Sequence, residues 1–161
     1  MDGRCFLLAL LVATPLFCQE KDPCADPAER QAWNDRQNPV YADATELAGA
    51  LEGRGFDVEC IARSKEEAMF DGQKGAAWFK TDHGIFEVWF LPKTETFSAL
   101  AVVERPGPNG AYSYTFQGTP RIPRTIQSPR QIWYIKSGNL LFEVWGDPLL
   151  AASLDSAFRK T

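Results

Sequence analysis

The sequence predicts an α+β domain, with an antiparallel sheet of about six strands, helices on one face and a further C-terminal helix. Three observations support this prediction. Apolar and polar residues alternate in strands joined by short turns, helical spacing recurs between these strands, and Phe86-Glu87-Val88-Trp89 returns 56 residues later as Phe142-Glu143-Val144-Trp145. Short turns make neighbouring strands antiparallel, which argues against a parallel βαβ sheet.

Composition and charge restrict the class of protein. The chain has 161 residues, 45% hydrophobic and 24% charged, which fits one globular domain. Its formal net charge is −4, so the average electrostatic field repels nucleic acid and anionic lipid. We therefore expect no nucleic-acid partner, and no motif indicates a cofactor.

Residues 1–18 are typical of a secretory signal peptide. Arg4 precedes an apolar run that ends at Phe17, and the sequence turns polar at Gln19. The run of about 14 residues is shorter than the roughly 20 that cross a bilayer, so we expect no transmembrane segment. Cleavage after Cys18 predicts a periplasmic or extracellular protein. The alternative is lipid anchoring at Cys18, which the bulky Phe17 disfavours.

Two cysteines, Cys24 and Cys60, remain after the signal peptide. In an oxidising compartment they predict a disulfide, which closes a loop of about 37 residues and is worth roughly 3–4 kcal/mol in the chain-entropy model. With one histidine besides these two cysteines, the chain lacks the usual ligands of a zinc site.

The first elements follow an N-terminal arm, residues 19–41. A capping-box spacing from Asp43 to Glu46 predicts a helix of about ten residues that ends at Gly53. The alternating stretch Phe56–Cys60 predicts a strand, and Ser64–Lys74 a charged connector.

The first hairpin is predicted from Ala77–Thr81 and Ile85–Phe90. With His83-Gly84 as its loop, Lys80 lies opposite Glu87 and Trp78 opposite Trp89 on one side. The other side is apolar and carries Phe79, Thr81, Phe86, Val88 and Phe90.

The later elements repeat this order. Helical spacing predicts a helix over Thr94–Glu104, followed by a strand at Ala111–Phe116 and a proline-rich loop at Gln117–Arg130. A second hairpin turns near Gly138-Asn139, and Asp147-Pro148 starts the last helix. The buried stripe predicted for that helix is Leu150, Leu154 and Phe158.

The repeated stretches divide residues 42–161 into two units, 42–97 and 98–161. At the offset of 56 residues, Phe56-Asp57-Val58 also falls on Tyr112-Ser113-Tyr114, and Pro92 falls on Pro148. A single unit of this size cannot bury its own apolar face, so repetition predicts two packed copies. We expect tandem helix–strand–hairpin repeats related by a pseudo-two-fold axis, within a single domain.

A resemblance rests on three stretches, which are Ala50-Leu51-Glu52-Gly53-Arg54-Gly55, Gly84 with Phe86-Glu87-Val88-Trp89, and Trp133-Tyr134 with Ser137-Gly138-Asn139-Leu140-Leu141-Phe142. Over about 110 residues the layout resembles a group of small exported or lipid-anchored bacterial proteins, to which no activity is attached. The resemblance implies export and fold, and carries no mechanism.

Four aromatic side chains are the first candidates for a binding site. Trp78, Trp89, Tyr134 and Trp145 are predicted to project from the sheet face opposite the helices. Exposed aromatic faces mark partner or ligand sites. The alternative is that the rings pack on each other, or under the arm with Trp33.

Three arginines form the one basic cluster, at Arg121, Arg124 and Arg130 of the proline-rich loop. Long loops concentrate binding residues, and prolines reduce the entropy lost on docking, which favours an anion or an acidic partner. The alternative is a solvated, proline-stiffened connector.

Two pairs of residues are candidates for catalysis. Glu87 and Glu143 would form an acid/base pair if the hairpins meet, whereas the structural alternative pairs each with Lys80 or Lys136. Asp82 and His83 would need a nucleophile brought from elsewhere in the chain, and a histidine in a turn is usually solvated.

The function predicted is a non-catalytic extracytoplasmic binding or interaction module that uses the aromatic sheet face. Its expected partner is a protein or small ligand of the cell envelope, with the oligomeric state open. The alternatives are a small hydrolase-like enzyme, working through Glu87 and Glu143 or through Asp82 and His83, and a structural envelope component.

Overall fold

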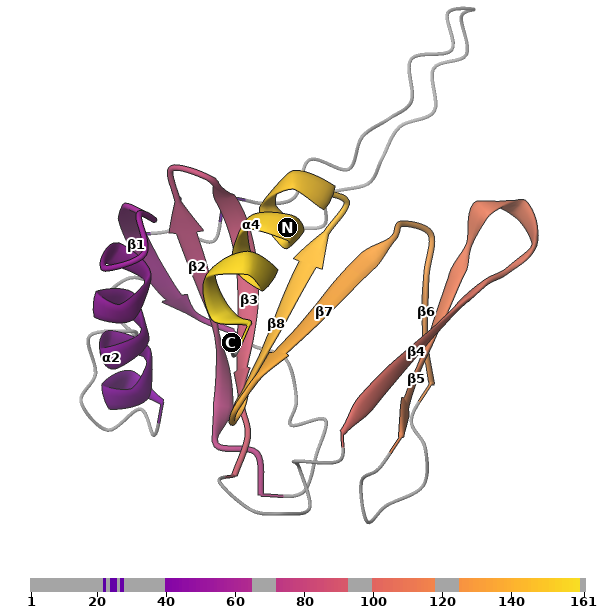
Figure 1. Ribbon diagram of the computed structural model, residues 1–161, viewed down its shortest axis with the longest axis horizontal. Helices are drawn as coiled ribbons and strands as arrows, with labels where there is room; N and C mark the ends of the chain where they lie inside the picture. Colours follow the sequence, from indigo (N-terminus) through magenta and orange to yellow (C-terminus); the bar gives the residue numbers. More distant parts are fainter. Residues whose placement is uncertain are drawn as a thin grey trace, which may run out of the picture.

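The computed structural model describes residues 22, 24, 25, 27, 40–64, 72–92, 100–117 and 125–159. This part of the chain forms an α+β structure with two antiparallel sheets and two α-helices (Figure 1). The predicted α+β class and antiparallel pairing are confirmed, whereas the single sheet of about six strands is wrong. Five strands form one sheet and three form another, because a second hairpin-like unit packs against the first sheet instead of extending it.

The five-stranded sheet has the order β1-β2-β3-β8-β7. Its central contact joins β3 and β8, the return strands of the two hairpins, as antiparallel neighbours. The strands are β1 (Val58–Arg63), β2 (Gly75–Thr81), β3 (Gly84–Phe90), β7 (Ile132–Ser137) and β8 (Leu140–Trp145).

The first hairpin turns at Asp82-His83 rather than at the predicted His83-Gly84. Thr81 and Gly84 are cross-strand partners, so Trp78 lies opposite Glu87. The Thr81 hydroxyl stabilises this turn, because it donates to Gly84 O and accepts from His83 N. The predicted partners were therefore wrong by two residues. A two-residue slip leaves every side chain on its predicted face.

The second hairpin and the last helix agree with their sequence signals. Ser137 and Leu140 are partners, which leaves Gly138-Asn139 as the predicted two-residue loop. Helix α4 (Pro148–Phe158) begins after Asp147, whose side chain accepts hydrogen bonds from Leu149 N and Leu150 N. Leu150 and Leu154 are buried as predicted.

Helix α2 (Tyr41–Glu52) confirms the first predicted helix but not its cap. It begins two residues before Asp43, and the N-cap residue Val40 makes no side-chain capping bond. Val40 instead lies in the core, 1% exposed, so packing fixes this end of the helix.

The second sheet corrects two further predictions. It consists of β4 (Ala101–Pro106), β5 (Tyr112–Gln117) and β6 (Thr125–Ser128), in that order, with a short 3-10 turn η1 (Pro108–Gly110) between β4 and β5. The helix predicted over Thr94–Glu104 is wrong over Ala101–Glu104, where β-branched Val102 and Val103 pair with β5. Part of the predicted loop Gln117–Arg130 is strand β6. Residues 93–99 and 118–124 lie outside the described residues.

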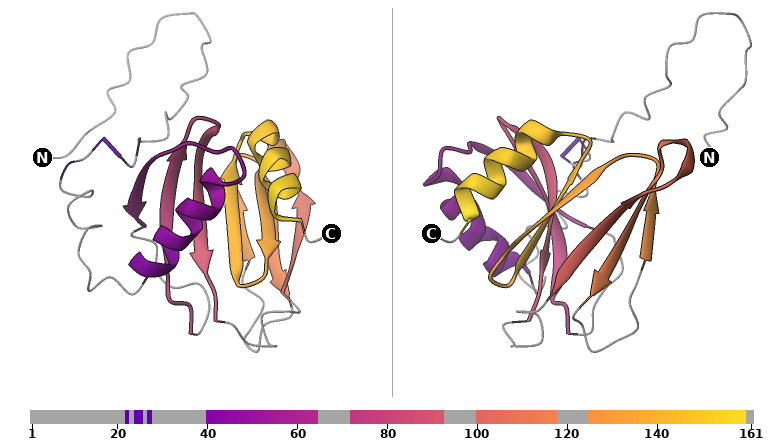
Figure 2. Two further views of the ribbon diagram at one scale, coloured as in Figure 1. Left: turned by 60° about the vertical axis from the view of Figure 1, so that its left-hand side comes forward. Right: turned by 45° about the vertical axis from the view of Figure 1, so that its right-hand side comes forward.

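Two apolar layers cover the five-stranded sheet, one on each face. Helices α2 and α4 lie on the same face, and the three-stranded sheet lies on the other (Figure 2). The helix layer buries Leu47, Leu51, Phe79, Phe86, Val88, Phe142 and Leu154, among others. The sheet layer buries Trp89, Leu91, Tyr114, Phe116, Ile132 and Leu141.

The two-repeat organisation is not confirmed. Strand β1 pairs with β2 at the edge of the five-stranded sheet, whereas β5, its predicted equivalent, is the middle strand of the other sheet. The repeated sequence does meet at one place, because Glu87 and Glu143 are direct cross-strand partners.

Candidate functional site

A row of four side chains crosses the middle of the five-stranded sheet on the face away from the helices. Trp78 lies opposite Glu87, Glu87 opposite Glu143, and Glu143 opposite Tyr134. We call these four residues the central row. Cross-strand partners have Cβ atoms about 4.5–5.5 Å apart, so the two carboxyl groups start from neighbouring positions. The sequence predicted a glutamate in each strand, and the structure brings the two together.

Both glutamates of the central row are buried, Glu87 to 2% exposure and Glu143 to 3%. Trp145 Nε1 donates a hydrogen bond to Glu143 Oε1 at 2.5 Å. A buried carboxyl group costs free energy when it is charged unless it is hydrogen-bonded or paired. The pair is therefore chemically able to share a proton, as in acid/base sites, although the surrounding layers restrict access to it.

The predicted ion pairs with the hairpin lysines do not follow the register. Lys80 lies opposite Ile85, and Lys136 lies opposite Leu141. Lys80 instead binds Asp22 at 2.9 Å and Glu59 at 3.3 Å. The predicted pairing of Lys80 with Glu87 is wrong because it placed the first turn one residue late, which moved Lys80 opposite Glu87.

Tyr134 connects the central row to the second sheet. Its ring packs edge-on against Tyr114 at 5.4 Å and Phe116 at 5.1 Å between ring centroids. Burial raises the pKa of the Tyr134 hydroxyl, and the negative charge of Glu143 raises it further. Tyr114 is fixed in turn, because Ile132 N donates to its hydroxyl oxygen at 2.6 Å.

The second sheet changes the interpretation of the predicted aromatic face. Trp89 is 3% exposed and belongs to the core between the sheets, so it is not a surface residue. Tyr134 and Trp145 pack against that core and are half-buried. Trp78 is also half-buried. The partly exposed members are thus Trp78, Tyr134 and Trp145, and the covering layer is this chain's own sheet.

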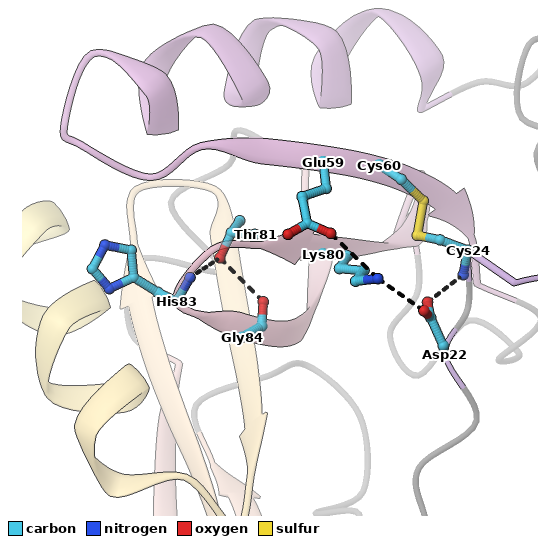
Figure 3. A network of polar contacts seen from close by, with 8 residues as sticks. All are labelled: Asp22, Cys24, Glu59, Cys60, Lys80, Thr81, His83 and Gly84. Carbon is cyan, nitrogen blue, oxygen red and sulfur yellow. Dashed lines mark hydrogen bonds and ion pairs between the residues drawn. A yellow bond between two sulfur atoms is a disulfide. The ribbon is translucent and has the colours of Figure 1, made fainter.

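A disulfide joins Cys24 to Cys60, with 6.2 Å between the two Cα atoms, as the sequence predicted. It ties the N-terminal segment to strand β1, beside the ion pairs that Lys80 makes with Asp22 and Glu59 (Figure 3). Asp22 both accepts from Cys24 N and binds Lys80. Hydrogen bonding to Asp22, and next to Glu59, raises the pKa of Lys80. These contacts hold Asp22 and Cys24 against β1 and β2.

Asp82 and His83 serve the turn that contains them. Asp82 Oδ1 accepts from Asp57 N at 2.9 Å, which joins the turn to the start of β1. The His83 ring packs against Phe56 at 4.7 Å and places Nε2 3.2 Å from Gly55 O. The separation of 3.7 Å between His83 Nε2 and Asp82 Oδ2 is long for the hydrogen bond of a catalytic dyad.

Of the predicted arginine cluster, only Arg130 falls in the described part. Its backbone N donates to the hydroxyl of the buried Ser128, just after β6, and its side chain is half-buried. Arg121 and Arg124 lie outside the described residues, so the arginine site stays a prediction.

The sequence did not predict a groove between the two helices. It is open to solvent, with an empty volume of about 480 Å³ including its mouth. Its lining residues are Asp43, Glu46, Leu47, Ala50, Phe90, Asn139, Leu140 and Phe158. The spacing of Asp43, Glu46, Leu47 and Ala50 on one helical face was visible in the sequence, as was the last helix, but the position of Phe158 beside this face was not.

Within the described ranges, no group of three or more histidine, cysteine, aspartate or glutamate side chains is arranged to hold a metal ion. No helix in these ranges is long and apolar enough to span a membrane. No protein-family model matches the chain, and no curated protein or solved structure shows significant similarity to it. The functional argument therefore rests on this chain's own geometry.

Proposed function

We propose that the chain is an exported, non-catalytic binding domain of the cell envelope. The binding surface in this proposal is the accessible margin of the aromatic face, formed by Trp78 and Trp145. The observation that carries the proposal is the different burial of the aromatic side chains. Trp89 is enclosed between the sheets, whereas Trp78, a member of the central row, and Trp145, which donates to Glu143 of that row, keep part of their surface exposed.

The chemistry of this margin favours a partner with apolar and cationic groups. Tryptophan supplies a large contact area and a π-face that attracts cations. The net charge of −4 gives such a partner a favourable long-range field. The titratable candidates support binding over catalysis, since Asp82 and His83 hold a turn and the two glutamates are enclosed.

The test compares envelope-fraction proteins and metabolites captured by the immobilised wild type and by a Trp78→Ala, Trp145→Ala double variant. Trp133→Ala is the matched control, because Trp133 is a half-buried tryptophan that packs on the helix side of the same sheet. Any captured species is then titrated against all three purified proteins. The proposal expects loss of affinity only in the double variant, and equal affinity for all three would refute it.

An acid/base enzyme is the second candidate, and the direct pairing of Glu87 with Glu143 favours it. An acid/base mechanism needs both carboxyl groups within reach of one substrate, and cross-strand pairing meets this requirement. Retaining glycoside hydrolases hold two carboxyl groups about 5–5.5 Å apart. Two glutamates whose Cβ atoms are about 4.5–5.5 Å apart, as in cross-strand partners, can bring their carboxyl groups into that range. For substrate to reach the pair, the second sheet would have to move.

Hydrolysis of a panel of aryl glycosides and aryl esters tests the enzymatic candidate. It expects turnover by the wild type that is lost in both Glu87→Gln and Glu143→Gln, with a bell-shaped pH dependence. Turnover that persists in either variant would assign the activity elsewhere, and absence of turnover on the whole panel would favour the binding domain.

A further inference from the structure

The groove between α2 and α4 combines an apolar floor with an acidic rim. Both helices lie on one face of the five-stranded sheet, side by side in both views of Figure 2. Phe90 and Leu140 come from the sheet, and Phe158 comes from the end of α4. Leu47 and Ala50 line the α2 side. These side chains offer an apolar surface of the kind that receives a short hydrocarbon or aromatic group.

One end of the groove is bridged by Arg54. Arg54 Nε donates to Ala157 O at 3.0 Å and Nη1 donates to Ala50 O at 2.8 Å, so the side chain joins the C-terminal ends of the two helices. Its guanidinium also lies 4.7 Å from the centre of the Phe158 ring. A ligand that enters the groove therefore meets a positive charge at this end.

The opposite charge lies toward the start of α2. Asp43 lies in the first turn of the helix and Glu46 one turn later, and both line the groove. Asp43 already binds an ammonium group of this chain, Lys74 Nζ, at 2.7 Å. Glu46 is exposed, and none of the ion pairs within the described residues includes it. The groove thus has the Asp43–Lys74 ion pair and the exposed Glu46 carboxylate toward one end, and a guanidinium at the other.

We propose that this groove binds a small organic ammonium compound, with its cationic group between Glu46 and Asp43 and its apolar group on Phe90, Leu140 and Phe158. The charge complementarity of the rim selects a cation, and the Lys74 contact shows an ammonium group held by the same carboxylate. The Arg54 bridge orients the ligand, because it repels the ammonium and leaves the apolar group at its end of the groove. This site is separate from the aromatic margin and does not depend on the function proposed above.

The first experiment titrates the full chain with n-hexylammonium, followed by amide chemical shifts. Saturable shifts are expected at Ala50, Asn139 and Leu140, with a dissociation constant of about 1 mM that weakens as salt rises. Neutral n-hexanol tests the apolar contribution, and hexanoate tests the sign of the charge. Both are expected to bind at least several-fold more weakly than the ammonium compound.

Variants with opposite expected effects test the orientation. Glu46→Gln should weaken n-hexylammonium binding about two- to fivefold, the range of an exposed ion pair. Lys74→Met should strengthen it, because this substitution releases Asp43 from its intramolecular ammonium partner. Glu52→Gln is the matched control, since Glu52 is an exposed residue of the same helix that does not line the groove. Ala50→Phe should fill the groove and abolish binding, with thermal unfolding confirming that the variant is folded.

Three results would overturn the proposal. Equal binding of n-hexylammonium and n-hexanol would show that charge plays no part. Shifts centred on residues outside the groove would place the ligand elsewhere, and equal weakening by Glu46→Gln and Glu52→Gln would reduce the effect to net charge. None of these results bears on the aromatic margin, because Trp78 and Trp145 lie on the other face of the sheet.

Discussion

The two faces of the five-stranded sheet are covered in different ways and contain different chemistry. The helix-covered face buries aliphatic and aromatic side chains together with Thr81, whose hydroxyl is hydrogen-bonded within the first turn. The sheet-covered face buries two glutamates among tyrosines and tryptophans. Burying apolar groups stabilises a fold directly, whereas buried carboxyl groups cost free energy unless they are hydrogen-bonded or neutralised. The helix side therefore supplies stability, whereas the sheet side keeps ionisable groups that packing alone does not require.

The largest expected effect is on the helix-covered face. Phe86 is fully buried, with its ring 5.6 Å from that of Phe79 and 6.0 Å from that of Phe142. Phe86→Ala should lower the free energy of unfolding by about 3–5 kcal/mol, since it removes apolar contacts and leaves a cavity. Urea unfolding measures this loss. A loss below about 0.5 kcal/mol, the usual size of a surface effect, would contradict the assigned core.

Removing the disulfide measures how much the attachment of the N-terminal segment to β1 contributes to the free energy of unfolding. A Cys24→Ser, Cys60→Ser double variant should lose about 2–4 kcal/mol, because its unfolded chain gains the entropy of an open loop. Urea unfolding with and without reductant provides the measurement. The wild type in reductant should match the variant, and a wild type insensitive to reductant would show that the bridge does not contribute.

Two substitutions of Glu143 distinguish the contribution of its hydrogen bond from that of side-chain packing. Glu143→Leu should cost about 1–3 kcal/mol, because the partly buried Trp145 Nε1 loses its acceptor. Glu143→Gln should cost less, since its amide oxygen can still accept that bond. Equal stability of the two variants, measured by urea unfolding, would show that this bond adds nothing.

The smallest effect is a difference in alkaline stability. The pKa of Tyr134 is raised, mainly by burial and then by the charge of Glu143, so the folded state keeps this proton when the unfolded chain releases it. Stability linked to this hydroxyl is present below about pH 10, the unfolded value, and is lost as the pH rises through and above it. Tyr134→Phe should therefore lose less stability than the wild type between pH 8 and pH 11. Parallel loss in both proteins would show that the hydroxyl is not held protonated.

The helix-covered face could largely be predicted from the sequence. Alternation assigned Phe79, Phe86, Val88 and Phe90 to one apolar side, and all four are in the helix-layer core. The signals at Asp147-Pro148 and Gly138-Asn139 also located a helix start and a turn correctly. These features depend on neighbours in sequence, where local patterns carry most of the information.

The other face could not be predicted because its cover comes from distant parts of the chain. The spacing of Leu100 and Ala101 favoured a helix, but pairing of Val102 and Val103 with β5 overrides that local preference. The sequence therefore predicted a helix where β4 lies, and without β4 it predicted no second sheet that could cover Trp89. The contact between Glu87 and Glu143 depends on strand order, which a pattern of alternation does not specify.

The Cys24–Cys60 bridge also affects how the molecule meets its own copies. Strand β1 is an outer strand of the five-stranded sheet, and outer strands present backbone groups to which another chain can add by β-pairing. The bridge fixes the N-terminal segment to this strand, and the register is irregular between Val58 and Cys60. Formation of the Cys24–Cys60 disulfide therefore disfavours β-pairing of this strand with another chain as well as unfolding. Reduction of the disulfide would remove both effects.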